Sequence, residues 1–271
     1  QKTSLSSGLL KRFRTAIWMV FREFYVTWGF IKLARDFNAH VFVSNDLDTL
    51  LAGVLSAGFS RKLVYDVHEL YPDLYVGLEI IPSPLIALLR IVEHVLSKNA
   101  NAVIAVNDLI AGELERRYHI HRPHVVLNTP KMIPRIEQRG SQSRVVKIAL
   151  YQGLYTRYRG LENLVRACEF LCRDVILVMR GYGPIEAKLR HIAEPFGNCR
   201  FEEPVPPSQL VSAASSADIG IVPYPPVNVN NYFASPNKIF EYIQAGLPIV
   251  GSGLPFLRKI VIENEIGHIF D

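Results

Sequence analysis

The segment SPNKIFEYIQAGLPIV, residues 235–250, combines a helix signal with side chains suited to an anionic ligand. Ser235 is a good N-cap, Pro236 suits the first helical position, and Gly246 suits the left-handed residue that ends a helix. The free N–H groups and the dipole at such a helix start favour an anion. Lys238 falls in the first turn, where the dipole disfavours a cation, so its presence there is best explained by an anion bound nearby.

A second pattern suited to phosphate is YQGLYTRYRGLENL, residues 151–164. Gly153 ends an expected strand, and Arg157 and Arg159 precede an expected helix. Backbone N–H groups and guanidinium groups in this arrangement can bind a diphosphate. A strand-to-helix turn with surface arginines explains the pattern equally well. The later MRGYGP, which contains Gly181 and Gly183, is weaker evidence, and a tight turn is its better interpretation.

The first half of the chain places His68 within VYDVHELYPD, at the end of an expected strand. Contact with a ligand and a local hydrogen bond within the loop explain this histidine equally well. We interpret Asp46, in SNDLDTL, as a helix cap or first-turn acid rather than as part of a metal site. The sequence contains no HExxH spacing and no GxSxG motif, so it predicts neither a metal site nor a hydrolytic nucleophile.

These segments need a scaffold, and runs of β-branched residues that alternate with helical periods predict a parallel α/β sheet. Strands are expected at 40–44, 62–67, 101–106, 124–128, 145–152, 174–180, 199–203, 218–224 and 247–252. Helices are expected near 9–35, 47–58, 84–98, 107–118, 160–172, 184–195, 207–215, 236–245 and 254–259.

A polar segment with two prolines, residues 129–144, is typical of a linker. The sequence therefore predicts two Rossmann-like domains, residues 1–128 and 145–271, that face a central cleft. In such folds ligands bind outside the carboxyl ends of the strands.

The composition, 271 residues with 49% hydrophobic and 20% charged, predicts a soluble globular protein with two cores. A net charge of +5 favours anionic partners, but no nucleic-acid-binding motif is present. Three cysteines without a pairing pattern favour the cytoplasm. The basic and aromatic segment 11–35 is interrupted by charges, and we prefer a helix packed on the sheet. A helix lying on the membrane surface, which would make the protein peripheral, is the alternative.

Taken together, YQGLYTRYRGLENL, MRGYGP, ADIGIVPY and SPNKIFEYIQAGLPIV resemble the donor-binding half of GT-B glycosyltransferases of family 4, the glycosyl transferases group 1. The segments LVYDVHELYPD, NAVIAVND and VVLNTP are similar to the acceptor-side domain of the same family. The SPxKxFEYxxxGxP segment is the most specific part and indicates a subgroup.

The resemblance implies a role for each matching residue. Glu241 would bind the ribose hydroxyls of a nucleotide sugar, and Lys238 with the turn at Ser235 and Pro236 would hold the diphosphate. Arg159 takes the position of a phosphate-binding lysine, and His68 would lie near the donor sugar. The remaining donor-binding positions that the resemblance implies are Gly153, Arg157, Gly181 and, next to the base, Val205.

The implied function is a retaining, metal-independent transfer of a sugar from a nucleoside diphosphate to a glycan, lipid-linked or other hydroxyl acceptor, without a cofactor. Arg159, Lys238 and His68 are the expected catalytic residues, and no catalytic base is assigned. Two positions depart from the family pattern, because Phe233 replaces a glutamate and Leu154 replaces an arginine for which Arg157 would compensate. By comparison with the family, we expect the chain to be clipped at both ends.

Two alternatives remain open at this stage. A sugar-nucleotide epimerase of the same fold would need acid and base carboxylates, for which Glu69 and Asp73 are the candidates. A binding protein or scaffold without catalytic activity would keep the nucleotide site alone.

Overall fold

The computed structural model describes residues 22, 25–34, 36–37, 39–76, 81–133 and 145–271. The chain divides into two compact units, Gln1–Leu127 with Asn228–Asn230, and Asn128–Val227 with Asn231–Asp271. Most of the predicted linker, residues 134–144, lies outside the described residues, as does most of the predicted helix 9–35, of which 25–34 are helical.

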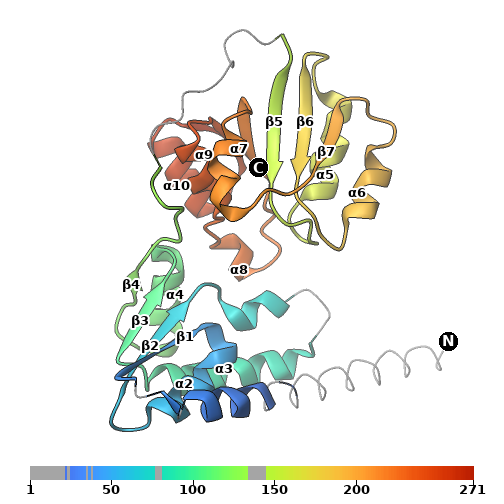
Figure 1. Cartoon of the computed structure of the whole chain (residues 1–271). Helices are drawn as coiled ribbons and strands as arrows, with labels where there is room; N and C mark the ends of the chain where they lie inside the picture. Colours follow the sequence, from blue (N-terminus) through green and yellow to red (C-terminus); the bar gives the residue numbers. More distant parts are fainter. Residues whose placement is uncertain (1–21, 23–24, 35, 38, 77–80, 134–144) are drawn as a thin grey trace, which may run out of the picture. The chain divides into compact units, whose positions relative to one another are not determined.

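The first unit is built on a parallel sheet with the strand order β1-β2-β3-β4, coloured blue to green in Figure 1. The strands are β1 (Val41–Asn45), β2 (Lys62–Val67), β3 (Ala102–Ala105) and β4 (His124–Val125). The connecting helices are α2 (Asp46–Ala57), η1 (Tyr71–Tyr75), α3 (Ser83–Ser97) and α4 (Asp108–Tyr118).

The second unit has a six-stranded parallel sheet with the order β10-β9-β8-β5-β6-β7. Its strands are β5 (Lys147–Gln152), β6 (Val175–Arg180), β7 (Cys199–Glu202), β8 (Ile219–Val222), β9 (Ile249–Ser252) and β10 (Gly267–Phe270). The chain runs outward from β5 to β7, returns to pair β8 with β5, and then continues in the opposite direction. This reversal of strand order is a topological switch point, beside which open α/β sheets bind ligands at the carboxyl ends of their strands.

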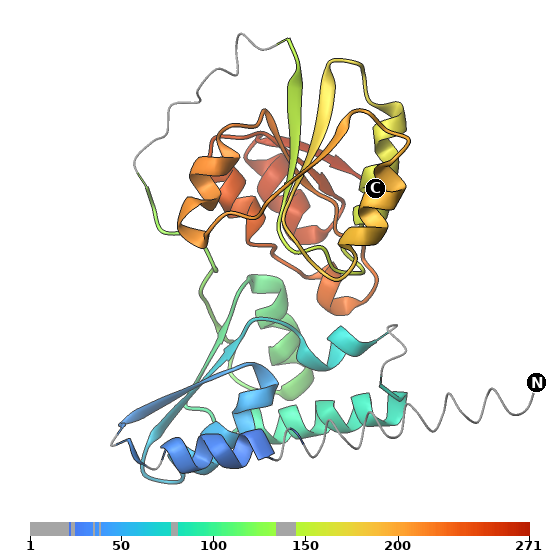
Figure 2. The same ribbon diagram turned by 45° about the vertical axis from the view of Figure 1, so that its right-hand side comes forward.

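Helices cover the second sheet and bury its apolar residues. They are α5 (Leu161–Arg166), η3 (Ala167–Phe170), α6 (Glu186–Ala193), η4 (Pro207–Gln209), α7 (Leu210–Ala214), α9 (Lys238–Gln244) and α10 (Pro255–Glu263). The short helix α8 (Val229–Tyr232) is divided between the two units. Figures 1 and 2 both show α5 and α6 packed together beside β5 and β6. Their interface buries Tyr155, Val165, Met179 and Leu189. No helix in the described part of the chain is long and apolar enough to cross a membrane.

The structure corrects the expected start of helix α9. Helix α9 begins at Lys238, after Asn237, rather than at Pro236, so Ser235 is not its N-cap. Its other end agrees with the prediction, because Gly246 has a φ of 74° and Leu247 N donates to Tyr242 O. Strand β10 and the short helices η1 and α8 were not predicted, because four or five residues carry too little periodicity.

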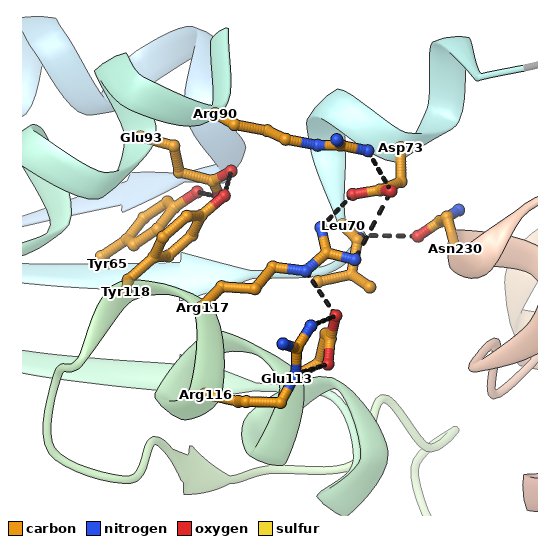
Figure 3. Close-up of polar contacts among 10 residues, drawn as sticks. All are labelled: Tyr65, Leu70, Asp73, Arg90, Glu93, Glu113, Arg116, Arg117, Tyr118 and Asn230. Atoms are coloured by element: carbon orange, nitrogen blue, oxygen red, sulfur yellow. Dashed lines mark hydrogen bonds and ion pairs between the residues drawn. The ribbon is translucent and has the colours of Figure 1, made fainter. Parts of the chain in front are cut away.

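The core of the first unit contains a buried carboxyl group. Glu93, on α3, is fully buried, and the hydroxyls of Tyr65 and Tyr118 each donate to one of its oxygens at 2.6 Å (Figure 3). Burial raises the pKa of Glu93 above its ordinary value of 4.5, although the two tyrosine hydrogen bonds oppose this. The folded protein therefore binds this proton more tightly than the unfolded chain does.

This burial predicts a pH-dependent effect of Glu93→Gln. The stability that wild-type Glu93 contributes is fully present below pH 4.5 and is lost as pH rises towards the folded pKa. Glutamine does not titrate, so the free energy of unfolding of wild type minus that of Glu93→Gln should decrease between pH 4.5 and 8, by up to about 1.4 kcal/mol per pH unit. Urea denaturation at several pH values measures this difference. A difference that stays constant or grows with pH would contradict the assignment.

Candidate functional site

The loops after β5 and β8 lie against each other at the switch point of the second unit. Gly160, in the loop after β5, has a φ of 73°, and a Cβ added there would lie 1.9 Å from the Pro223 carbonyl oxygen, just after β8. The loop after β6 lies equally close to the loop after β5, because a Cβ on Gly181 would lie 1.9 Å from the Gly153 carbonyl oxygen. The glycines in these two patterns therefore serve close packing of three strand-end loops.

A buried lysine lies at the centre of these loops. Lys238, at the start of α9, is 8% exposed, and its Nζ donates to the Tyr224 hydroxyl at 3.3 Å. The same Nζ lies 5.0 Å from the ring centroid of Tyr151 and 4.8 Å from that of Tyr224. A Cβ on Gly153 would lie 3.4 Å from it, so the ammonium group faces the loop after β5. Two aromatic faces and one hydroxyl thus replace the water that Lys238 loses.

The charge of Lys238 persists in this environment. Burial by itself lowers the pKa of the ammonium group, but the neighbouring Tyr224 and Tyr151 outweigh it, and the pKa of Lys238 is raised above its ordinary value. Arg159 adds a second cation, because its guanidinium carbon lies over the Tyr224 ring, 4.4 Å from the ring centroid. Among the residues that the structure describes, Lys238 and Arg159 contact aromatic rings and a hydroxyl and form no ion pair with a carboxylate, so this part of the site carries positive charge.

A row of polar residues ends the three strands next to the lysine. Gln152, Arg180 and Glu202 are the last residues of β5, β6 and β7 and pair with one another across the sheet. The Gln152 side-chain amide donates to Glu241 Oε2 at 2.9 Å, which connects this row to α9. The sequence analysis missed Gln152, Arg180, Tyr151 and Tyr224. Polar residues at the ends of otherwise apolar strands were the signal for the first two.

The structure brings together most of the residues predicted for the second unit. Arg159 and Lys238 both contact Tyr224, Gly153 lies beside Lys238, and Gly181 packs on Gly153. Arg157 is exposed and forms no ion pair with the residues that the structure describes, and Val205 is half-buried. Ser235 is half-buried and Pro236 is buried, in the turn that precedes α9.

In the first unit, His68 lies in a loop that local hydrogen bonds define. Its Nε2 is 3.3 Å from Asp66 Oδ2, and its backbone N–H donates to Asp46 Oδ1 at 2.9 Å. Asp46 also accepts from the Glu69 N–H. Burial raises the pKa of Asp46, against these hydrogen bonds. Asp46 does lie in the first turn of α2, but its carboxylate fixes the loop after β2 instead of capping the helix.

Asp73, a candidate acid or base of the epimerase alternative, is 1% exposed and bound by two arginines (Figure 3). Arg90 Nη2 donates to its Oδ1 at 2.9 Å, and Arg117 Nη1 donates to its Oδ2. Arg117 also binds Glu113, and the network lines a hollow of about 650 Å³. A carboxylate held in this way is a structural anchor and is poorly placed to exchange protons.

Asp73→Ala should destabilise the protein by about 3 kcal/mol, because it leaves two guanidinium groups without their shared partner. Asp108→Ala is the control, since Asp108 and Arg122 form an exposed pair at 3.7 Å, and it should cost less than about 1 kcal/mol. Urea denaturation measures both variants. Equal effects of the two substitutions would show that the Asp73 network is no more important than a surface ion pair.

Gly181→Ala should destabilise the second unit by roughly 2–3 kcal/mol, because the added methyl group overlaps the Gly153 carbonyl. Gly197→Ala is the matched control, because a Cβ there meets no atom within 4 Å. Thermal denaturation of both variants provides the measurement. Wild-type stability of Gly181→Ala would mean that the loops can separate at little cost.

No group of three or more His, Cys, Asp or Glu side chains that could hold a metal ion occurs among the residues that the structure describes.

The chain is similar in sequence to known glycosyltransferases. Residues 146–271 match the family described as glycosyl transferases group 1. A D-inositol 3-phosphate glycosyltransferase from Corynebacterium urealyticum is 26% identical over 207 residues, which are 67% of this chain and 47% of the relative. The protein of the same name from Corynebacterium diphtheriae is 26% identical over 206 residues. The chain spans about half the length of these curated relatives.

Solved structures show the same fold. Sucrose-phosphate synthase from Thermosynechococcus elongatus has a TM-score of 0.69 at 19% identity, over 90% of this chain and 63% of that one. HepE from Anabaena, solved with UDP and glucose, has a TM-score of 0.63 at 13% identity, over 90% and 67%. The predicted fold class is confirmed: two parallel α/β units with a GT-B-like fold.

Proposed function

We propose that this chain, whose residues 146–271 carry the glycosyl transferases group 1 domain, acts as a retaining glycosyltransferase that uses a nucleoside-diphosphate sugar. The observation that carries the proposal is the pair of cations, Lys238 and Arg159, around Tyr224 at the switch point of the second sheet. Structures of similar fold were solved with UDP and a sugar, which supports the choice of donor.

The chemistry of such a transfer requires stabilisation of a departing nucleoside diphosphate. Negative charge grows on the diphosphate as the bond to the sugar breaks, and cations already in place lower the energy of that state without reorganisation. Lys238 is fixed between two rings, and Arg159 stacks on one of them, so both are preorganised. We assign them to the diphosphate, with the backbone of Gly153 and the turn at Ser235 and Pro236 beside them.

Glu241 is assigned to the ribose. It is half-buried on α9, one turn after Lys238, and a carboxylate can accept hydrogen bonds from two neighbouring hydroxyls. We assign His68 to the donor sugar and Gly181 and Val205 to the vicinity of the nucleotide. These assignments, and the SPxKxFEY subgroup, follow from the sequence resemblance.

The acceptor is proposed only as a hydroxyl of a glycan, a lipid-linked sugar or a similar molecule. The curated relatives are named for transfer to an inositol phosphate, and a phosphorylated acceptor is one member of this class. The epimerase alternative loses one of its two candidate carboxylates, because Asp73 is buried between Arg90 and Arg117.

Calorimetric titration with UDP, GDP and ADP tests the donor site. One nucleotide should bind, and Glu241→Ala should weaken it roughly tenfold to a hundredfold, as expected for lost hydrogen bonds to a charged group. Lys238→Met should strongly weaken the binding of the nucleoside diphosphate and should hardly change the binding of the corresponding nucleoside. Arg159→Met provides the same test at a half-buried position if Lys238→Met does not fold.

Exposed residues of α10 supply the controls, Glu263→Ala and Lys259→Met, and both should bind like wild type. A folded chain that binds none of the three nucleotides would overturn the proposal. Binding without release of nucleoside diphosphate from any donor sugar would favour the scaffold, and conversion of the sugar on the nucleotide would favour the epimerase.

A further inference from the structure

The ends of β5, β6 and β7 form a continuous polar chain that leads to Glu241. Glu202 Oε2 accepts from Arg180 Nε at 3.0 Å and from Arg180 Nη2 at 2.7 Å. Arg180 Nη1 donates to Gln152 Oε1 at 3.2 Å. The Gln152 amide nitrogen then donates to Glu241 Oε2 at 2.9 Å.

Two members of this hydrogen-bonded series are buried. Gln152 is 2% exposed and Arg180 is 8% exposed, whereas Glu202 lies at the exposed end. Buried polar groups cost free energy unless they are paired, so an apolar residue would be the simpler choice at the end of β5 or β6. The buried amide and the buried guanidinium are paired with each other and with neighbouring acceptors, namely Glu202 for Arg180, and Glu241 and the Leu210 carbonyl for Gln152.

The order of donors and acceptors fixes the direction of the Gln152 amide. Arginine only donates and a carboxylate only accepts, whereas an amide does both. Arg180 donates to the amide oxygen, so the amide nitrogen is directed to its two acceptors, Glu241 Oε2 at 2.9 Å and the Leu210 carbonyl oxygen at 3.3 Å. A glutamate in place of Gln152 would satisfy Arg180 but would meet Glu241 with like charge.

The second oxygen of Glu241 remains available. Within the described part of the chain, the hydrogen bonds of this carboxylate involve Oε2 alone. The hydrogen bond from Gln152 therefore holds Oε2 and leaves Oε1 for another donor. A half-buried side chain with one oxygen held in place has fewer rotamers to lose when a ligand binds.

We propose that Gln152, held by Arg180 and Glu202, is a positioning residue that orients Glu241 towards the ribose hydroxyls of the donor. This inference rests on the proposed function, because it takes Glu241 as the ribose contact. It adds a specificity element, since a fixed carboxylate distinguishes a ribonucleotide from a 2′-deoxyribonucleotide better than a mobile one.

The test compares UDP, GDP and ADP with their 2′-deoxy counterparts in calorimetric titrations of the full chain. Wild type should prefer the ribonucleotide that it binds by about tenfold or more. Gln152→Met keeps the volume of the side chain but cannot donate a hydrogen bond to Glu241. It should weaken the binding of the ribonucleotide about fivefold to tenfold and should hardly change the binding of the deoxynucleotide. The preference should fall accordingly.

Coupling between residues provides a stricter criterion. If Gln152 acts through Glu241, the double variant Gln152→Met with Glu241→Ala should bind like Glu241→Ala alone. Gln152→Glu should reduce the ribonucleotide preference at least as much as Gln152→Met, through repulsion of Glu241. Gln209→Met, at an exposed position, is the control and should leave the preference unchanged.

Each result assigns the failure to one proposal. If wild type discriminates between the two sugars and Gln152→Met discriminates equally well, or weakens both nucleotides equally, Gln152 is structural and only the positioning proposal is wrong. If wild type binds a nucleotide without preferring ribose, the role of Glu241 and the positioning proposal are both wrong. If the folded chain binds no nucleotide, the proposed function fails and the inference fails with it.

Discussion

The second unit depends on the close approach of three strand-end loops, at distances that allow no side chain at two positions. Gly160 packs on the carbonyl of Pro223, and Gly181 packs on the carbonyl of Gly153. Because these loops belong to β5, β6 and β8, their contact brings the two halves of the sheet together at the point where the strand order reverses. The side chain of Lys238 lies beside Gly153, where that residue has no side chain of its own. A buried cation therefore lies at the switch point.

The two units treat buried charge differently. In the second, Lys238 is surrounded by aromatic faces and a hydroxyl, so its positive charge is stabilised without being neutralised and stays available to an anion. In the first, Asp73 is neutralised by two arginines. A charge that is already paired contributes to the packing of its unit, whereas an unpaired cation next to a glycine loop is suited to binding. Under the proposed function, this contrast favours the second unit as the one that would bind a diphosphate.

The series of hydrogen bonds from Glu202 to Glu241 orients the carboxylate of Glu241. Lys238 and Glu241 lie one turn apart on α9, and the first is fixed by tyrosines while the second is fixed by an amide. A short helix thus presents a cation and a carboxylate whose directions are both set by strands of the sheet. The helix itself is seven residues long, and its position is defined by what it packs against, including the Tyr242 hydroxyl that accepts from the Gln152 N–H at 2.9 Å.

Local sequence signals were sufficient to predict the alternation of strands and helices, the glycines at strand ends and the end of α9 at Gly246. These signals depend on neighbours within one or two turns. The candidate nucleotide residues Lys238 and Glu241 came from a helix-start pattern and from the family resemblance, and their roles stay predictions. The partners of each residue could be found only in the folded structure. Gln152 and Glu241 are 89 residues apart, and the pairing of Gln152 with Arg180 depends on strand register. Asp73 and Arg117 meet across 44 residues. The burial of Lys238 and Asp73, and the start of α9 after Asn237, likewise depend on which elements the fold packs together, because burial and hydrogen-bond partners are properties of residues close in space and distant in sequence.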